Sequence, residues 1–198
     1  FNAYGQLGDG TTTDKNTPTQ IGSATNWSAV AAGWEHTVGI KSDGTLWAWG
    51  RNNYGQLGDG TTGNKDTPTQ IGSATSWSAV ATVGWHTVGL KSDGTLWAWG
   101  SNDTGQLGDG TTGNKNTPTQ IGSATSWSAV AAGYAHTVGL KSDGTLWAWG
   151  WNGLGQLGDG TTTDKTTPTQ IGSATNWSAV ATGGWHTVGL KSDGTLWA

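Results

Sequence analysis

One 50-residue unit occurs four times in this chain, and it constrains the fold more than any other feature. The stretch Gly-Gln-Leu-Gly-Asp-Gly-Thr-Thr begins at residues 5, 55, 105 and 155, and no insertion or deletion separates the copies. A fixed period of this length is typical of solenoids and propellers, in which each unit buries its apolar faces against its neighbours. The units 1–50, 51–100, 101–150 and 151–198 are therefore expected to form a single propeller or propeller arc.

Each unit contains four short segments with the composition of β-strands. In the first repeat these are 27–32, 36–41 and 46–50, together with a proline-containing segment at 17–21. The sequence Ser42-Asp43-Gly44-Thr45 predicts a hairpin between the second and third strands, because glycine accepts the positive φ that such turns need. No segment shows a sustained 3.6-residue apolar stripe, so the chain is predicted to be all-β.

The strand order within a blade also follows from composition. Residues 46–50 are apolar on both faces, as expected for a sheet packed between two neighbours. Pro18 cannot donate a ladder hydrogen bond and therefore suits an edge strand, whereas the alanine-rich segment 27–32 suits the crowded position near the axis. We expect a β-propeller of four-stranded antiparallel blades, each ordered from axis to rim as 27–32, 36–41, 46–50 and 17–21.

An open arc of four blades would expose apolar sheet faces at both ends. The sequence predicts a lone rim strand at 17–21 and a last blade that lacks its rim strand. Three forms of closure remain open: further repeats in a longer chain, a homodimer of two arcs that makes an eight-bladed ring, and a four-bladed ring.

The stretch from Trp127 to Gly158 follows the pattern W-x-x-V-A-A-G-x-x-H-T-V-G-L-K-x-D-G-T-L-W-x-W-G-x-N-x-x-G-Q-L-G. This pattern resembles the repeat of the regulator of chromosome condensation family and covers essentially the whole chain. The resemblance implies a β-propeller, usually with seven blades, whereas four units are present here. Nucleotide exchange on a small GTPase, as in the family's founding member, would be expected to use an inserted β-wedge, for which the uniform period leaves no room.

Twelve of the 50 repeat positions differ among the four units. Most lie at 32–35 and at 51, 53, 54, 63, 64 and 66 with their equivalents, in connections that share one face of an antiparallel meander. This face carries Phe1, Leu154 and eight candidate ligand-binding residues: Trp34, Glu35, Arg51, Tyr54, Trp85, Tyr134, Trp151 and Trp185. Because Trp, Tyr and Arg anchor protein interfaces, we predict a protein-binding face. The alternative is drift of duplicated repeats at tolerant loop positions.

The loop pattern is also similar to that of a secreted bacterial β-lactamase inhibitor propeller, which grips its enzyme through aromatic residues on this face. The resemblance implies a protein-binding role for Trp34, Tyr54, Trp85, Tyr134 and Trp185.

The charge balance and the titratable residues argue against several other functions. Thirteen acidic and nine basic residues give a net charge of −4, which opposes binding to nucleic acids or anionic membranes. The four histidines at 36, 86, 136 and 186 occupy one repeat position, too far apart to ligate one metal ion, so we expect each to hydrogen-bond a neighbouring blade. Asp9 and Asp43 are predicted turn residues, and Lys41 is expected to be a solvated strand end.

No catalytic constellation is evident. The chain has no cysteine, no Gly-x-Ser-x-Gly elbow and no phosphate-binding loop, and Glu35 has no evident partner carboxylate. We therefore expect a non-enzymatic binding scaffold without cofactor or metal. A carbohydrate-binding, lectin-like propeller is the alternative, which identical pockets at each blade would favour, and a structural fragment without a ligand is the third. A homo-oligomer and an origin in a longer, secreted or cell-surface bacterial protein are further expectations.

Overall fold

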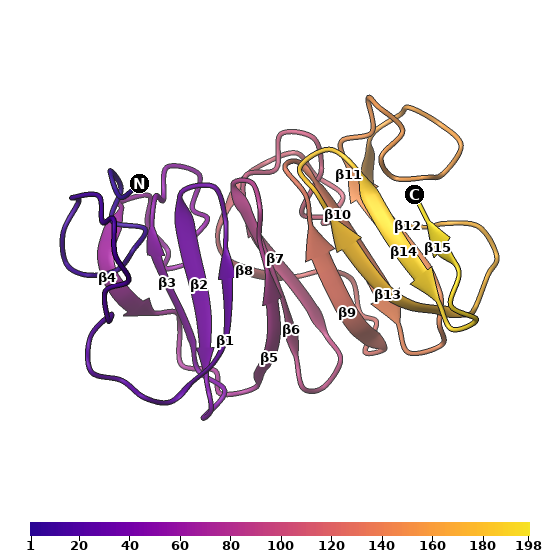
Figure 1. Ribbon diagram of the computed structural model, residues 1–198. Helices are drawn as coiled ribbons and strands as arrows, with labels where there is room; N and C mark the ends of the chain where they lie inside the picture. The colour runs from indigo at the N-terminus through magenta and orange to yellow at the C-terminus, as the bar shows by residue number, and fades with distance from the viewer.

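The computed structural model describes all residues 1–198 and contains fifteen β-strands and no helix (Figure 1). The strands form four antiparallel sheets that we call blades 1 to 4. Blade 1 contains β1 (Trp27–Ala32), β2 (His36–Lys41), β3 (Leu46–Gly50) and β4 (Lys65–Gln70). Blade 2 contains β5 (Trp77–Ala81), β6 (His86–Lys91), β7 (Leu96–Gly100) and β8 (Lys115–Gln120). Blade 3 contains β9 (Trp127–Ala132), β10 (His136–Lys141), β11 (Leu146–Gly150) and β12 (Lys165–Gln170), and blade 4 contains β13 (Trp177–Thr182), β14 (Thr187–Lys191) and β15 (Leu196–Trp197).

The predicted all-β class and the order of strands in a blade are confirmed. Each complete sheet is a meander in chain order, with the alanine-rich strand at one edge and the proline-containing strand at the other. The inner strands β1, β5, β9 and β13 contact one another along the array, which places them nearest the axis. The predicted hairpin also forms, because Gly44 has a φ of +77° and Asp43 accepts a hydrogen bond from the Thr45 amide.

The predicted rim strand at 17–21 is wrong, since residues 1–26 contain no strand. In the complete blades, the rim strand pairs with the third strand of the same sheet, as Thr69 does with Ala48. The equivalent third strand for residues 17–21 would precede residue 1 and so lies outside residues 1–198. The segment therefore has no ladder partner. Residues 1–10 instead lie against blade 1, where the Gly10 amide donates to the Asp66 carbonyl oxygen over 2.9 Å.

The hydrophobic core lies between blades. Val38, Ile40 and Leu46 of blade 1 are at most 2% exposed and belong to the same cluster as Trp77 and Trp99 of blade 2. Equivalent residues form a second cluster between blades 2 and 3 and a third between blades 3 and 4. Each such buried aliphatic or aromatic side chain stabilises the fold by about 1.5–3 kcal/mol, so the junctions hold the array together.

A chain of hydrogen bonds also joins each blade to the next. The Nε2 atom of His36 lies 3.0 Å from the Thr87 hydroxyl, and that hydroxyl donates to the Gln56 carbonyl oxygen over 2.8 Å. Because the hydroxyl proton is used, Nε2–H of His36 must be the donor, which fixes the histidine tautomer. The expectation that each histidine bonds a neighbouring blade is confirmed for His36, His86 and His136.

The long loop after each third strand is organised by a buried asparagine. In blade 2, the Asn102 side-chain amide donates to Asp109 and to the Thr111 and Gly113 carbonyl oxygens, and its Oδ1 accepts from the Leu107 amide. Asn2, Asn52 and Asn152 occupy the same position and are likewise fully buried. These invariant repeat residues therefore set the shape of the loop, a role that the sequence analysis missed.

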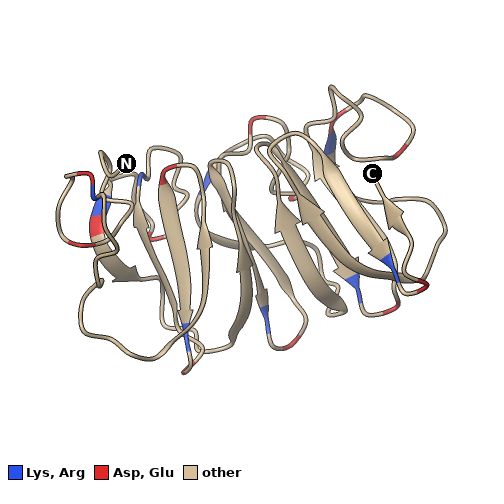
Figure 2. Ribbon diagram, viewed as in Figure 1, with Lys and Arg blue, Asp and Glu red and all other residues tan.

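Charged side chains gather at the strand ends and in the loops, while the strand centres carry none (Figure 2). Asp9, Asp59, Asp109 and Asp159 each pair with the lysine six residues later in the chain, at 2.9–3.1 Å. Asp9 also accepts from the Thr11 amide, which confirms the predicted turn. Lys41 is the last residue of β2, as expected, and is partly exposed; its Nζ also lies 3.7 Å from the Trp47 ring centroid in a cation–π contact that was not predicted.

The four blades form an open arc, with blades 1 and 4 at opposite ends (Figure 1). The four-bladed ring that the sequence allowed is therefore not formed. Leu196 and Trp197 of blade 4 are 72% and 52% exposed, whereas the equivalent Leu46 of blade 1 is fully buried. At the other end, Val30 of blade 1 is 71% exposed.

Candidate functional site

The two sets of variable loops meet at one end of the blades. Within each of blades 1 to 3, the residue after the third strand donates its amide to the loop that follows the inner strand. Arg51 donates to the Glu35 carbonyl oxygen over 2.7 Å, and Trp151 donates to that of Ala135 over 2.8 Å. The antiparallel meander places the hairpins such as Asp43-Gly44 at the opposite end, so the predicted common face for the variable loops is confirmed.

Six aromatic side chains from all four blades contact one another on this face. We call Trp34, Tyr54, Trp85, Tyr134, Trp151 and Trp185 the aromatic cluster. Trp85 lies at its centre, stacked on Tyr54 at 5.2 Å and on Trp34 at 5.9 Å between ring centroids. Tyr134 contacts Trp34, Trp85 and Trp185 at 5.2, 5.3 and 4.4 Å, and Trp151 contacts Trp185 at 5.3 Å. The cluster is therefore continuous along the arc.

The alternation of residue types in this loop has a packing reason. Blades 1 and 3 carry Trp34 and Tyr134, whereas blades 2 and 4 carry glycine at the same position and place tryptophan one residue later. The backbone of Tyr134 approaches Gly84 so closely that a Cβ on Gly84 would overlap the Tyr134 carbonyl oxygen. Glycine in blade 2 thus admits the neighbouring loop, and the shifted Trp85 packs against both Trp34 and Tyr134, which also contact each other.

The two charged candidates pair with each other beside the aromatic cluster. Arg51 donates a hydrogen bond to the Glu35 carboxylate, and this bond raises the pKa of Arg51 above its usual value. The guanidinium also lies 4.8 Å from the Tyr4 ring centroid and 5.8 Å from that of Trp85. Glu35 and Arg51 therefore leave no net charge, and burial among the rings raises the pKa of Tyr134, which keeps its hydroxyl neutral.

All eight predicted site residues thus lie in one contiguous group. Trp34 and Trp185 are 59% and 48% exposed and offer the largest accessible rings, whereas the other six are half-buried. The sequence analysis missed Tyr4, which holds Arg51 and contacts Phe1 at 6.3 Å. Its equivalence to Tyr54 in the repeat was the signal that could have identified it. Leu154, which was also predicted to lie on this face, is 69% exposed.

No group of three or more His, Cys, Asp or Glu side chains is arranged to hold a metal ion. Nor does the structure contain a helix with the length and apolar character needed to cross a membrane. The groups that the site offers to a partner are large aromatic rings, the Glu35–Arg51 ion pair and tyrosine hydroxyls, all of which act through non-covalent contacts.

Comparison with known proteins identifies the repeat. The profile described as "Regulator of chromosome condensation (RCC1) repeat" matches residues 1–40, 43–90, 93–140 and 143–190. A 54-residue stretch is 39% identical to the ultraviolet-B receptor UVR8 of Arabidopsis thaliana, and it covers 26% of this chain and 12% of that protein.

Two solved structures share the fold. Human WBSCR16 superimposes with a TM-score of 0.87 at 23% identity, covering 99% of this chain and 54% of that one. Prp20p from Saccharomyces cerevisiae, described with its binding properties to Gsp1p and histones, gives a TM-score of 0.75 at 23% identity, covering 84% and 44%. This chain therefore spans about half the length of either structure, and at these identities the likeness shows the fold alone.

Proposed function

We propose a binding function for this chain, which belongs to the regulator of chromosome condensation (RCC1) repeat family: a non-enzymatic scaffold whose aromatic cluster recognises a protein partner. One observation carries the proposal, namely that the variable residues of four otherwise near-identical blades join into a single continuous surface. A surface that differs from blade to blade suits one extended, asymmetric partner.

The energetics of interfaces support this function. Trp and Tyr contribute most to binding when they are held rigid before the partner arrives, because little side-chain entropy is then lost. Trp34 is held by Trp85 and Tyr134, and Trp185 by Tyr134 and Trp151. The relative Prp20p is described as binding Gsp1p and histones, which gives a precedent for protein partners on this fold.

Selection from a displayed library of random dodecapeptides tests the proposal. We expect the chain to enrich peptides whose binding is weakened about tenfold or more by Trp34→Ser or Trp185→Ser, as for interface anchors. Trp197→Ser is the matched control, since Trp197 is similarly exposed but lies in β15 at the open end of blade 4. A library that yields no binders, or binders that all tolerate both substitutions, would contradict the proposal.

We propose in addition that two copies of this chain associate through the open ends of the arc. Leu190 and Leu196 of blade 4 are exposed, yet the equivalent Ile40 and Leu46 of blade 1 are buried against blade 2. At the other end of the arc, Val30 of blade 1 is exposed. Val80, the equivalent residue of blade 2, packs against the hydrophobic cluster that blade 2 shares with blade 1. The two ends therefore repeat the two halves of an internal junction.

A further inference from the structure

Two grooves of nearly identical construction lie at the rim of the array, away from the aromatic cluster. The first lies between blades 1 and 2 and has a volume of about 580 Å³, and the second lies between blades 2 and 3 with about 670 Å³. Twelve lining positions correspond at a spacing of 50, from Asp59 and Asp109 to Pro118 and Pro168, whereas Thr111 and Lys115 line only the second groove and Trp97 only the first. The structure thus builds the same concave site twice, on a scale that holds small ligands.

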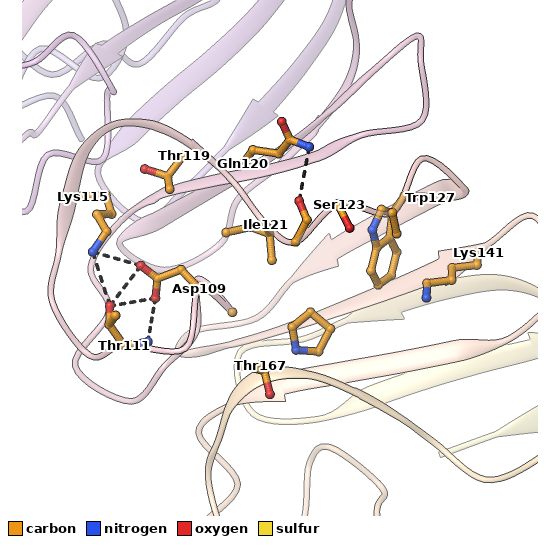
Figure 3. A pocket seen from close by; sticks show the side chains of 14 residues that line it. Asp109, Thr111, Lys115, Thr119, Gln120, Ile121, Ser123, Trp127, Lys141 and Thr167 are labelled. Atoms are coloured by element: carbon orange, nitrogen blue, oxygen red, sulfur yellow. Dashed lines mark hydrogen bonds and ion pairs between the residues drawn. The ribbon is translucent and has the colours of Figure 1, made fainter.

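The lining is mostly polar. Only three of the 14 residues around the second groove are hydrophobic. Gln120 and Ser123 come from β8 and the turn that follows it, and Thr167 comes from the neighbouring rim strand β12 (Figure 3). Such hydroxyl and amide groups both donate and accept hydrogen bonds, as a sugar hydroxyl does, and so few apolar residues disfavour a lipid.

A buried donor without a partner lies at the edge of each groove. Trp77 and Trp127 are each 6% exposed, and the indole N–H of each has no acceptor in the protein. In Figure 3, the indole nitrogen of Trp127 is on the side of the ring that faces Ser123 and the groove. The N–H of Trp49, Trp99 and Trp149 in the core is unpartnered in the same way, and the groove-lining nitrogens have almost no accessible surface, so a ligand oxygen reaches this costly unpaired donor only when the adjacent turn shifts.

Each groove also carries a lysine outside the five ion pairs, Lys91 or Lys141, which interacts electrostatically with the hairpin aspartate two residues later but is not in direct contact with it. Asp109 is paired with Lys115 at 2.9 Å, whereas Lys141 belongs to none of the five ion pairs in the protein. Lys141 is held 3.7 Å from the Trp147 ring centroid and 5.1 Å from that of Trp127. Lys91 is held in the same way in the first groove. The rings fix each ammonium and leave N–H donors for an anionic ligand group.

From these observations we infer that the two rim grooves are subsites for an acidic oligosaccharide, with Lys91 and Lys141 binding its carboxylates. The repetition of the groove on successive blades favours a polymeric ligand. Identical sites on successive blades can engage successive units of a chain with a chemical repeat, which raises the overall affinity through multivalency. A folded protein surface has no such repeat, so this site is distinct in ligand and place from the aromatic cluster.

Titration of the ¹⁵N-tryptophan-labelled chain with hexagalacturonate, followed by NMR of the indole N–H signals, tests the inference. Trp77→Phe and Trp127→Phe assign the two signals. We expect hexagalacturonate to shift both and the neutral cellohexaose to bind at least about tenfold more weakly, which corresponds to about 1.4 kcal/mol. Unmoved signals with hexagalacturonate, or equal binding of cellohexaose, would overturn the inference.

A second pair of variants avoids the hydrophobic core. Ser73 and Ser123 are exposed at the groove walls, so Ser73→Phe with Ser123→Phe should fill both grooves without unfolding the chain. We expect this double variant to lose hexagalacturonate binding. Ser173→Phe is the matched control. Ser173 is the equivalent of Ser123 in the next repeat, but within residues 1–198 no residues equivalent to Thr167 and Pro168 form the opposite wall of a groove beside it. Binding that survives the double variant would refute the assignment, and Trp34→Ala should leave it unchanged.

Discussion

At the scale of single residues, the contacts made by the repeated histidine and lysine positions were not equally predictable from the sequence. The histidine position was correctly predicted to bond the neighbouring blade, because four identical residues in an array cannot converge on one ion. The lysine position was correctly predicted to end a strand, but its ring contact was missed, because a strand-end lysine gives no sign that a ring lies beneath it. Sequence pattern identifies which positions repeat, and only the packing between strands shows what each one touches.

The buried histidines predict a loss of stability in mild acid. Burial lowers the pKa of His36 and His86 to about 3 and that of His136 to about 4, from an ordinary 6.5. Below pH 6.5 the unfolded chain takes up protons that the folded chain cannot, so the free energy of unfolding falls as pH falls. Each of these histidines should cost about 2 kcal/mol between pH 6.5 and pH 5.

Urea denaturation at pH 7, 6 and 5 measures this effect in a range above the titration of the aspartates. His86→Gln keeps a hydrogen-bonding side chain opposite Thr137 and removes the titration. We therefore expect a shallower pH dependence for this variant than for the parent chain. Parallel pH profiles for the two proteins would show that His86 is protonated without cost.

At the scale of the element, the strands and their order within a blade were predictable, and one rim strand was not. Residues 17–21 have the same sequence as the residues at 67–71, yet only the latter contribute to a strand, because only they have a third strand to pair with. A sequence pattern indicates that a segment is able to form a strand. Whether the strand forms depends on the presence of a neighbouring strand that pairs with it. The site was predicted as a set of residues and a face, but the contacts within it depend on how neighbouring loops interleave.

The interleaving predicts unequal effects for one substitution at two equivalent positions. Gly84→Ala places a Cβ against the Tyr134 carbonyl oxygen and should destabilise the junction of blades 2 and 3 by about 1–3 kcal/mol. Gly184→Ala meets nothing within 4 Å and should change stability by no more than about 0.5 kcal/mol. Urea denaturation measures both, and near-ultraviolet circular dichroism reports the aromatic cluster. Equal destabilisation would contradict the proposed packing role of Gly84.

At the scale of the whole molecule, the exposed ends predict self-association. We expect the mass measured by light scattering behind a sizing column to rise with concentration above the 20.3 kDa of one chain. Leu190→Lys with Leu196→Lys should hold the chain at that mass, because charges would then replace the apolar end face. Leu154→Lys is the control, since Leu154 is about as exposed as Leu196 but lies in the loop face. A parent chain that stays monomeric across the dilution series would refute the proposal.

The junctions between blades have a consequence for how this molecule loses its structure. Four blades share three apolar clusters, so the array behaves as a linear chain of units with nearest-neighbour coupling. In such a system the terminal units fray first, since each is coupled on one side only. Closure into a ring would add one coupling without adding a unit, and no unit would then be terminal. A second copy, or further repeats, that closed the ring would thus change unfolding from a progressive process into a concerted one.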